Sequence, residues 1–489
     1  MTCIMLLMKN SAMLLACLMA AGAANAATDW RALAAADLES ARAAIRAGHP
    51  GYIDEQNPAF RAWEAKGYDE ARALLPRVNS YDSMPSAVRY YIAGFQDGHL
   101  GYSDNIRKDS ELISAGWALA YAGGAYRVTG VMPKWGKPLP PVGAELVACD
   151  GVQPEQLLRQ LSRYYDGRDL PGVHHDLAPL LTAESMPGEE LKECSFRTAQ
   201  GKMRKFAQHY AKAKFEDVMA MNRTAPRPAR LNAYTLQDGV LWLRAGNFQP
   251  DREAAQQIEK MLEELPRLEG VRTIVFDSRG NGGGNSEFGE RFFNAATGGL
   301  AMDAADESAV PHSFAQWRVS DAAIAGMDFR LERIGAAQGK DSQDYKWVAE
   351  LRERILKAKA DGLPWAEQAG DPRLSRADIA ARHGRLRRFS GKVVLVTDEH
   401  CASACLDFAD LVRSVPGAIH MGQATSADTL YMDIGRVTLP SGNVLILPLK
   451  VWRNRLRGNN EVLQPDVPLQ VDIRDDAAVR KAVLAALPR

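Results

Sequence analysis

Two segments of the sequence carry residue types that could perform acyl transfer. The apolar run that begins the segment 271–285, VRTIVFDSRGNGGGN, ends in a glycine-rich turn. The segment 391–412, GKVVLVTDEHCASACLDFADLV, is an apolar run followed by Ser403 at the start of a predicted helix. A serine hydroxyl becomes a nucleophile when a base accepts its proton, and bare N–H groups of a glycine turn can stabilise the resulting oxyanion. The pair of segments therefore predicts the chemistry of a serine hydrolase, and we favour a peptidase.

Each segment also has a purely structural interpretation. Ser403 could be an ordinary N-cap of its helix, which needs no chemistry. The run Arg279-Gly280-Asn281-Gly282-Gly283-Gly284 could be a tight turn. A phosphate-binding loop is disfavoured, because the run lacks the Lys-Ser/Thr of a P-loop and the GxGxxG order of a dinucleotide site. Four glycines directly after a buried strand favour a loop whose backbone approaches a ligand.

The ordered motifs DSRGNGGG, CASAC, GQAT and QPDVPL resemble the S41 peptidase family, the C-terminal processing and tricorn-like proteases. The resemblance covers about 231–471 and implies a multi-domain α/β protein with a ClpP/crotonase-like catalytic core. It implies that Ser403 is the nucleophile, in a Ser-Ala-x-Glu segment where Leu406 replaces the glutamate. It also implies an oxyanion hole made by the N–H groups of Ala404 and Gly283, with a latitude of one residue in the glycine run.

The general base separates two branches of that family. One branch uses a lysine 25 residues after the serine, but that position is Asp428 and the segment 422–433 contains no lysine. The branch that resembles tricorn protease uses a histidine from an N-terminal segment. The sequence DGHL at 97–100 resembles that segment, so we expect His99 to be the base. The competing histidines are His400 and His420.

The acid that supports the base is a choice between two carboxylates. We favour Glu461 in RGNNEVLQPD, because it precedes the closing Pro465-Asp466 of the resemblance. Asp428, which occupies the vacant lysine position, is the alternative. Each could also be an ordinary loop carboxylate.

Four regions are expected along the chain. Residues 1–26 form a signal peptide, and 27–105 form a helical region that carries His99. Residues 106–223 form a β-rich module with connecting helices, and the segment VGAELVACDG makes it resemble a PDZ domain. Such a module docks an extended peptide at a sheet edge, and the alternative is a strand-rich insert without a ligand. Residues 224–489 form the catalytic core, with a helical insertion at about 302–368 in which no β pattern is visible.

The N-terminus predicts export. Lys9, an apolar stretch and the small-residue site Ala24-Asn25-Ala26 are typical of a cleaved signal peptide. The apolar stretch is shorter than the roughly 20 residues that span a bilayer, so we expect no integral membrane span after cleavage. The mature protein is expected to be periplasmic or secreted, and lipidation at Cys17 is a less favoured alternative.

The cysteines that remain after cleavage allow disulfides in an oxidising compartment. We favour a bridge between Cys149 and Cys194. Cys401 and Cys405 bracket Ser403, and either a local bridge or two buried thiols is compatible with their spacing.

Composition and the remaining motifs limit the classes of binding partner and cofactor that we expect. Sixty basic and sixty acidic residues cancel, which argues against recruitment by nucleic acid. We assign His174-His175-Asp176 to a solvated loop, and no metal or organic cofactor is implied. Polypeptides are the expected substrates, and the sequence leaves the oligomeric state open.

Two functions other than peptidase are compatible with the same fold. One is a non-catalytic protein that binds peptides or small ligands, which the missing lysine and Leu406 favour. The other is a crotonase-like enzyme acting on thioesters, which the export signal disfavours because acyl-CoA substrates are cytoplasmic.

Overall fold

The computed structural model describes residues 28–104, 111–182, 190–222, 228–298, 313–368, 389–455 and 457–487. The predicted signal peptide and Cys17 lie outside these ranges. Within the described residues, no helix combines the length and apolarity needed to cross a membrane.

The candidate catalytic core is built on a six-stranded sheet with the order β18-β15-β14-β11-β10-β9, in which only β9 runs antiparallel to its neighbour. The strands are β9 (Asn232–Gln237), β10 (Val240–Ala245), β11 (Thr273–Asp277), β14 (Lys392–Thr397), β15 (Ile419–Gly422) and β18 (Val467–Pro468). β11 is buried along its whole length, as expected of a central parallel strand covered on both faces.

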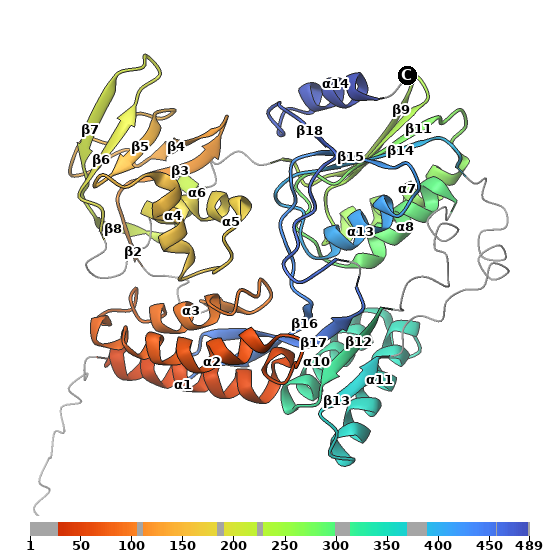
Figure 1. Cartoon of the computed structure of the whole chain (residues 1–489), viewed down its shortest axis with the longest axis horizontal. Coiled ribbons are helices and arrows are strands. Elements are labelled where there is room, and N and C mark those ends of the chain that lie inside the picture. Colours follow the sequence, from red (N-terminus) through yellow and green to blue (C-terminus); the bar gives the residue numbers. More distant parts are fainter. Residues whose placement is uncertain are drawn as a thin grey trace, which may run out of the picture.

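Helices cover both faces of this sheet (Figure 1). They are α7 (Arg252–Glu264), α8 (Ser286–Thr297), α13 (Ala404–Arg413) and α14 (Asp476–Ala486). Successive strand residues point to opposite faces. Ile274 and Phe276 therefore pack in the layer of α7, α8 and α13, whereas Val275 packs with Val479 of α14. These crossover units agree with the predicted α/β core.

The N-terminal region is helical, as predicted. Its helices are α1 (Trp30–Gly48), α2 (Pro58–Arg72) and α3 (Ser86–Ala93), with 3-10 turns η1 (Pro50–Tyr52) and η2 (Leu75–Arg77). Asp29 caps α1 by accepting a hydrogen bond from Ala32 N. The region continues into β1 (Gly101–Ser103), which pairs antiparallel with β17 (Val444–Arg453). This pairing attaches the segment that carries His99 to the C-terminal half of the chain.

The insertion at 302–368 differs from the helical prediction. Its described residues contain α10 (Asp321–Gln338) and α11 (Gln343–Ala360), but also β12 (Phe314–Arg318) and β13 (Trp365–Gln368). β12 pairs with β13 and with β17, and β16 (Tyr431–Thr438) completes this second sheet. β12 alternates buried and half-buried residues, with Ala315 and Trp317 facing the core. The sequence analysis missed these strands because they have only five and four residues and their pairing partners lie far away in the sequence.

The β-rich module forms a separate sheet, in the upper left of Figure 1, with the order β3-β4-β5-β6-β7. Its strands are β3 (Trp117–Ala122), β4 (Ala125–Val131), β5 (Glu145–Cys149), β6 (Glu193–Arg197) and β7 (Met203–Ala207), and β2 (Glu111–Ser114) pairs with β8 (Ala211–Lys214) beside it. The helical elements are α4 (Pro154–Ser162), α5 (Pro171–Leu177), η4 (Ala178–Thr182) and α6 (Phe215–Asn222). The favoured bridge between Cys149 and Cys194 is present and joins β5 to β6.

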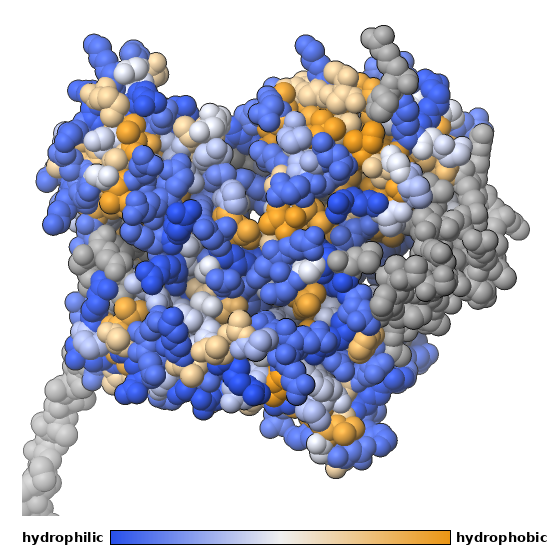
Figure 2. Space-filling view, in the orientation of Figure 1, coloured by the Kyte–Doolittle hydropathy of each residue, from blue (hydrophilic) through white to orange (hydrophobic). Residues whose placement is uncertain are grey.

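The surface is hollowed between the module and the catalytic sheet (Figure 2). A cavity of about 420 Å³ lies there, bounded by β3 and α5 on the module side. The loop before Ser403, at 399–400, and residues 469–474 bound it on the other side. The module therefore faces the loop that leads to Ser403 across this hollow.

Candidate active site

Ser403 lies on a sharp turn between β14 and α13. Its backbone has φ +54° and ψ −125°, a conformation that a non-glycine residue rarely adopts. Its side chain makes no capping hydrogen bond to the helix, which argues against the N-cap interpretation. Strained backbone at a half-buried serine between a strand and a helix is the geometry of a nucleophile elbow.

The turn is supported from both sides. Cys401 and Cys405 are fully buried and form a disulfide, so the first of the two alternatives for this pair holds. Leu406, where the family resemblance places a glutamate, is fully buried in the core beneath α13. A carboxylate at 406 would face apolar neighbours, which is a physical reason for the leucine here.

His99 meets Ser403 across 304 residues of sequence. Its Nε2 lies 3.4 Å from Ser403 Oγ, a long hydrogen bond of the kind found in sites without substrate. His99 is anchored by its own backbone, since His99 N donates to Asp97 Oδ1 at 2.9 Å. The predicted nucleophile and base are therefore brought together.

The acid beside His99 is Asp428 rather than Glu461. Asp428 Oδ1 lies 3.3 Å from His99 Nδ1, and the carboxylate is almost completely buried. Glu461 is exposed and accepts a hydrogen bond from Gly458 N, and within the described ranges it makes no hydrogen bond or ion pair with His99. The structure therefore does not support Glu461, which the sequence analysis favoured. The alternative, Asp428, occupies the position beside His99 from which an acid can orient the imidazole.

Burial raises the pKa of the Asp428 carboxyl, while the proximity of His99 and the charges of the guanidinium groups of Arg455 and Arg457 oppose that effect. Burial in the absence of these cations would disfavour the ionised form still more. The position therefore requires nearby positive charge to hold a carboxylate.

A buried network that the sequence analysis missed holds the two loops together. Asp97 accepts hydrogen bonds from Thr429 Oγ1 at 2.8 Å and pairs with His49 Nε2 at 3.0 Å. Gly51 N donates to His49 Nδ1, so the His49 proton resides on Nε2 and is donated to Asp97. Burial opposes ionisation of Asp97, but the contacts with His49 and the nearby His99 hold its pKa below the ordinary value. The sequence analysis included Asp97 only within the DGHL segment that carries His99.

The competing histidines have other partners. His420 is buried, with Nε2 2.7 Å from Thr397 Oγ1, and burial lowers its pKa to about 4. His400 lies between Asp398 and Asp176; burial opposes protonation, but the two carboxylates raise its pKa to about 10. Of the predicted candidates, only His99 is placed at Ser403.

The glycine loop runs directly against the nucleophile. Gly283 has φ +96°, and a Cβ built there would lie 2.7 Å from Ser403 Cβ, so only glycine fits this approach. Polar side chains fix the loop: Asn281 Nδ2 donates to Ala245 O, and Gly280 N donates to Asp398 Oδ2. Arg279 is buried and pairs with Asp277 and Asp476, so it anchors the loop and does not face Ser403.

The predicted oxyanion donors differ in availability. The N–H of Ala404 has no acceptor among the residues that the structure describes. The N–H of Gly283 donates to Asn281 Oδ1 at 2.9 Å, whereas the N–H of Gly282 has no acceptor within those same residues. The second oxyanion donor is therefore still either Gly283 or its neighbour Gly282, and of these two it is Gly282 whose N–H has no acceptor within the described residues.

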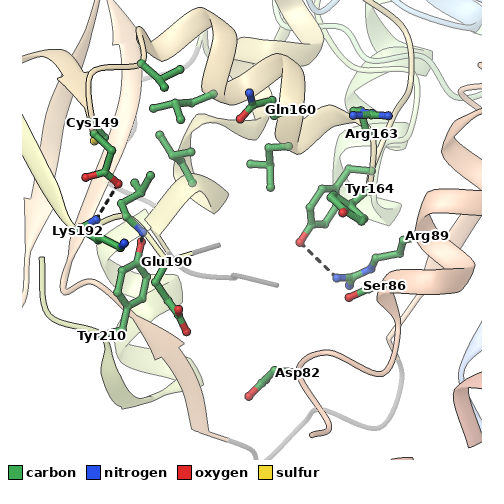
Figure 3. A pocket seen from close by; sticks show the side chains of 17 residues that line it. Asp82, Ser86, Arg89, Cys149, Gln160, Arg163, Tyr164, Glu190, Lys192 and Tyr210 are labelled. Carbon is green, nitrogen blue, oxygen red and sulfur yellow. Dashed lines mark hydrogen bonds between the residues drawn. The ribbon is translucent and has the colours of Figure 1, made fainter. Parts of the chain in front are cut away.

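A second cavity, of about 520 Å³, lies away from this chemistry (Figure 3). It is formed between α3, which supplies Arg89, and the module, which supplies Gln160, Lys192 and Tyr210. None of the candidate site residues lines it. Geometry therefore places the reactive groups at the nucleophile turn and not in this cavity.

Known proteins resemble the chain in sequence over its core and in fold over nearly its whole length. Residues 239–469 match the model of the family described as peptidase family S41. The solved structure "mature CPAF complexed with lactacystin" has 13% identity and a TM-score of 0.57, and the match covers 94% of this chain and 99% of that one. A second structure, "mature CPAF", has 12% identity and a TM-score of 0.55, with 92% and 94% covered. No curated protein sequence matches this chain. At these identities the structural likeness establishes the mixed α/β, multi-sheet fold.

Proposed function

Since residues 239–469 belong to peptidase family S41, a family of serine peptidases, we propose that this protein is an exported endopeptidase that uses Ser403, His99 and Asp428. The observation that carries the proposal is the approach of His99 Nε2 to Ser403 Oγ at 3.4 Å on a strained turn. The substrates are polypeptides, as in any peptidase. Glu461 has no part in this mechanism.

The mechanism follows from the positions of the groups. Ser403 Oγ attacks the peptide carbonyl while His99 Nε2 accepts the hydroxyl proton. His99 then donates that proton to the leaving amine, and a water hydrolyses the acyl-enzyme by the same route. Asp428 Oδ1, 3.3 Å from His99 Nδ1, orients the imidazole by accepting a hydrogen bond from Nδ1–H in the productive complex, and it stabilises the transient imidazolium.

The oxyanion of the tetrahedral intermediate is stabilised by backbone N–H groups. Ala404 N–H opens α13, where the unpaired N–H groups of a helix N-terminus favour negative charge. The second donor comes from the glycine loop. Gly283 lies against Ser403 but shares its N–H with Asn281, so Gly282 is the alternative.

Cleavage of an unfolded protein, followed by intact-mass detection of the products, tests the proposal. Wild type should release peptides, whereas Ser403→Ala and His99→Ala should release none. Ser414→Ala is a matched control, since Ser414 lies at the far end of α13 and its hydroxyl donates to the nearby Leu411 O. A fluorophosphonate adduct that maps to Ser403 would identify the nucleophile independently. If wild type cleaves nothing, the alternative function, a non-catalytic protein that binds peptides or small ligands, would be favoured over the peptidase.

Export is supported by the two disulfides, because such bridges persist mainly in oxidising compartments. Processing after Ala26 would leave Ala27 as the first residue of the mature protein. Mass spectrometry of the secreted or periplasmic form tests this, and a cytoplasmic protein that retains residues 1–26 would contradict it.

We also propose that the module is PDZ-like and contacts substrate. Docking at the edge of β3 has a constraint, because Ala115 N donates to Thr182 O and Thr182 Oγ1 donates to Trp117 O. The start of that edge is thus occupied by the chain itself. A peptide must use the later part of β3 or displace η4, and crosslinking of a bound peptide would distinguish these routes.

A further inference from the structure

Arg168 belongs to the module but reaches the two loops that carry the candidate base and acid. It lies between α4 and α5, and its Nη1 donates to Ala427 O at 2.7 Å. A Cβ built on Gly98 would lie 2.7 Å from Arg168 Nη2, so the guanidinium lies against the Gly98 backbone. Positions 98 and 427 directly precede His99 and Asp428. One planar cation therefore links the two segments whose relative position the mechanism requires.

The guanidinium is held rigidly. Its side chain is only 11% exposed, and its Nε and Nη2 donate to the two carboxylate oxygens of Asp166 at 2.8 and 2.5 Å. This bidentate pairing fixes the plane of the guanidinium. The third nitrogen is left to bind Ala427 O, so the side chain has little freedom to move without breaking these bonds.

The positive charge of Arg168 also offsets the negative charges of two buried carboxylates. Burial opposes protonation of Arg168, but Asp166, Asp428 and Asp97 together keep its pKa above the ordinary value. Asp97 and Asp428 are both buried carboxylates. Two buried anions near each other are costly unless a cation lies close by. Loss of this cation should therefore disturb both catalytic segments at once.

The module has other attachments to the rest of the protein. Gly167 N donates to Ala93 O at 3.2 Å, and His175 Nδ1 lies 2.6 Å from Glu399 Oε2, on the loop before Ser403. Removing the Arg168 guanidinium should leave these contacts in place. Its effect can thus be separated from detachment of the module.

We propose that Arg168 is a positioning residue that holds the His99 and Asp428 segments in their productive arrangement, so that hydrolysis depends on the docked module. This inference rests on the proposed function. Arg168 touches neither Ser403 nor the reacting atoms in this account, and it acts through Gly98 and Ala427.

The first test compares Arg168→Met and Arg168→Lys with Arg159→Met in the full mature protein. Arg159 is an exposed arginine on α4 that pairs with Asp169 at 3.0 Å, so its loss should leave cleavage unchanged. Arg168→Met should lower kcat by about 10- to 100-fold, the range expected when catalytic groups are misplaced by an ångström or less. KM should change little. Lysine should restore little, because it cannot reproduce the bidentate pairing together with the bond to Ala427.

Two further measurements separate positioning from loss of folding. Millimolar guanidinium ion should restore part of the kcat of Arg168→Gly, which a globally destabilised variant would not show. Hydrogen exchange should become faster in peptides covering 96–100 and 425–431 of Arg168→Met, while exchange in the catalytic sheet stays unchanged.

An active wild type together with an unchanged kcat in Arg168→Met would overturn the inference, whatever the exchange rates. If wild type cleaves nothing, the proposed function fails and hydrogen exchange alone decides about Arg168. Faster exchange in both segments would then support the link, and unchanged exchange would refute it.

Discussion

Cys401 and Cys405 form a disulfide that encloses Ser403. The bridge joins the residue two before the serine to the first turn of α13, and both sulfurs are buried. The strained backbone at Ser403 is thus held between a covalent link and the core. The second bridge, between Cys149 and Cys194, lies in the module and joins residues that are 45 apart in the sequence.

Removing one bridge should mainly lower kcat, whereas removing the other should mainly lower stability. Replacing Cys401 and Cys405 by alanine should lower kcat, because the serine turn loses its constraint, but should cost only about 2 kcal/mol of stability for so short a loop. Replacing Cys149 and Cys194 should cost about 4 kcal/mol and leave the chemical step nearly unchanged. Chemical denaturation and steady-state kinetics on both variants check this. A Cys401/Cys405 variant with full kcat would contradict it.

Asp428→Asn should lower kcat by about 10⁴-fold, as loss of the orienting carboxylate does in comparable triads. Glu461→Gln is the matched control and should stay within about threefold, as expected for an exposed side chain outside the site. The comparison is made by kcat/KM on one peptide substrate, with circular dichroism to verify folding. The reverse order of effects would restore Glu461 as the acid.

Gly283→Ala should nearly abolish activity. The added Cβ meets Ser403 Cβ and Ala402 O at 2.7 Å, and φ +96° is unfavourable for alanine. A stability loss of about 1–3 kcal/mol should accompany the effect. Gly282→Ala is the control, because alanine keeps the backbone N–H of position 282 and its Cβ meets the end of the Arg230 side chain, which can move. Equal activity of the two variants would show that the close approach at Gly283 is not required.

His420 should make stability depend on pH between about 6.5 and 4. Burial lowers its pKa to about 4 in the folded protein from 6.5, so the unfolded chain binds the proton more readily. Its contribution to stability is therefore complete above pH 6.5 and is lost as pH falls toward 4, by up to about 3 kcal/mol.

The measurement for His420 is denaturation of wild type and His420→Gln at pH 7 and pH 4. The variant should lose less stability on acidification, since glutamine does not titrate. Glutamine is a suitable replacement because His420 acts as a donor here. The hydroxyl proton of Thr397 goes to Gln423 O, so Thr397 Oγ1 accepts the hydrogen bond from His420 Nε2. Identical pH dependence in both proteins would rule out this role for His420.

The sequence identified the elements whose evidence is local. An apolar run buried on both faces shows as continuous hydrophobicity, so β11 and β14 and the loops after them were predictable. Ser403 and the glycine run follow these strands directly. His99 lies far away in sequence, and only the motif DGHL indicated it.

Only the tertiary structure decided the features that depend on pairing between distant segments. The choice of Asp428 over Glu461 required the meeting of the loop at 97–100 with the loop at 425–431, which Asp97 and Thr429 bring about. β12 became a strand because β17, more than a hundred residues later, offers it backbone partners. The link from Arg168 to Gly98 and Ala427 joins three separate segments. Residue type and spacing determine which groups can react, but side-chain distances across loops arise only when the packed core fixes the loop ends.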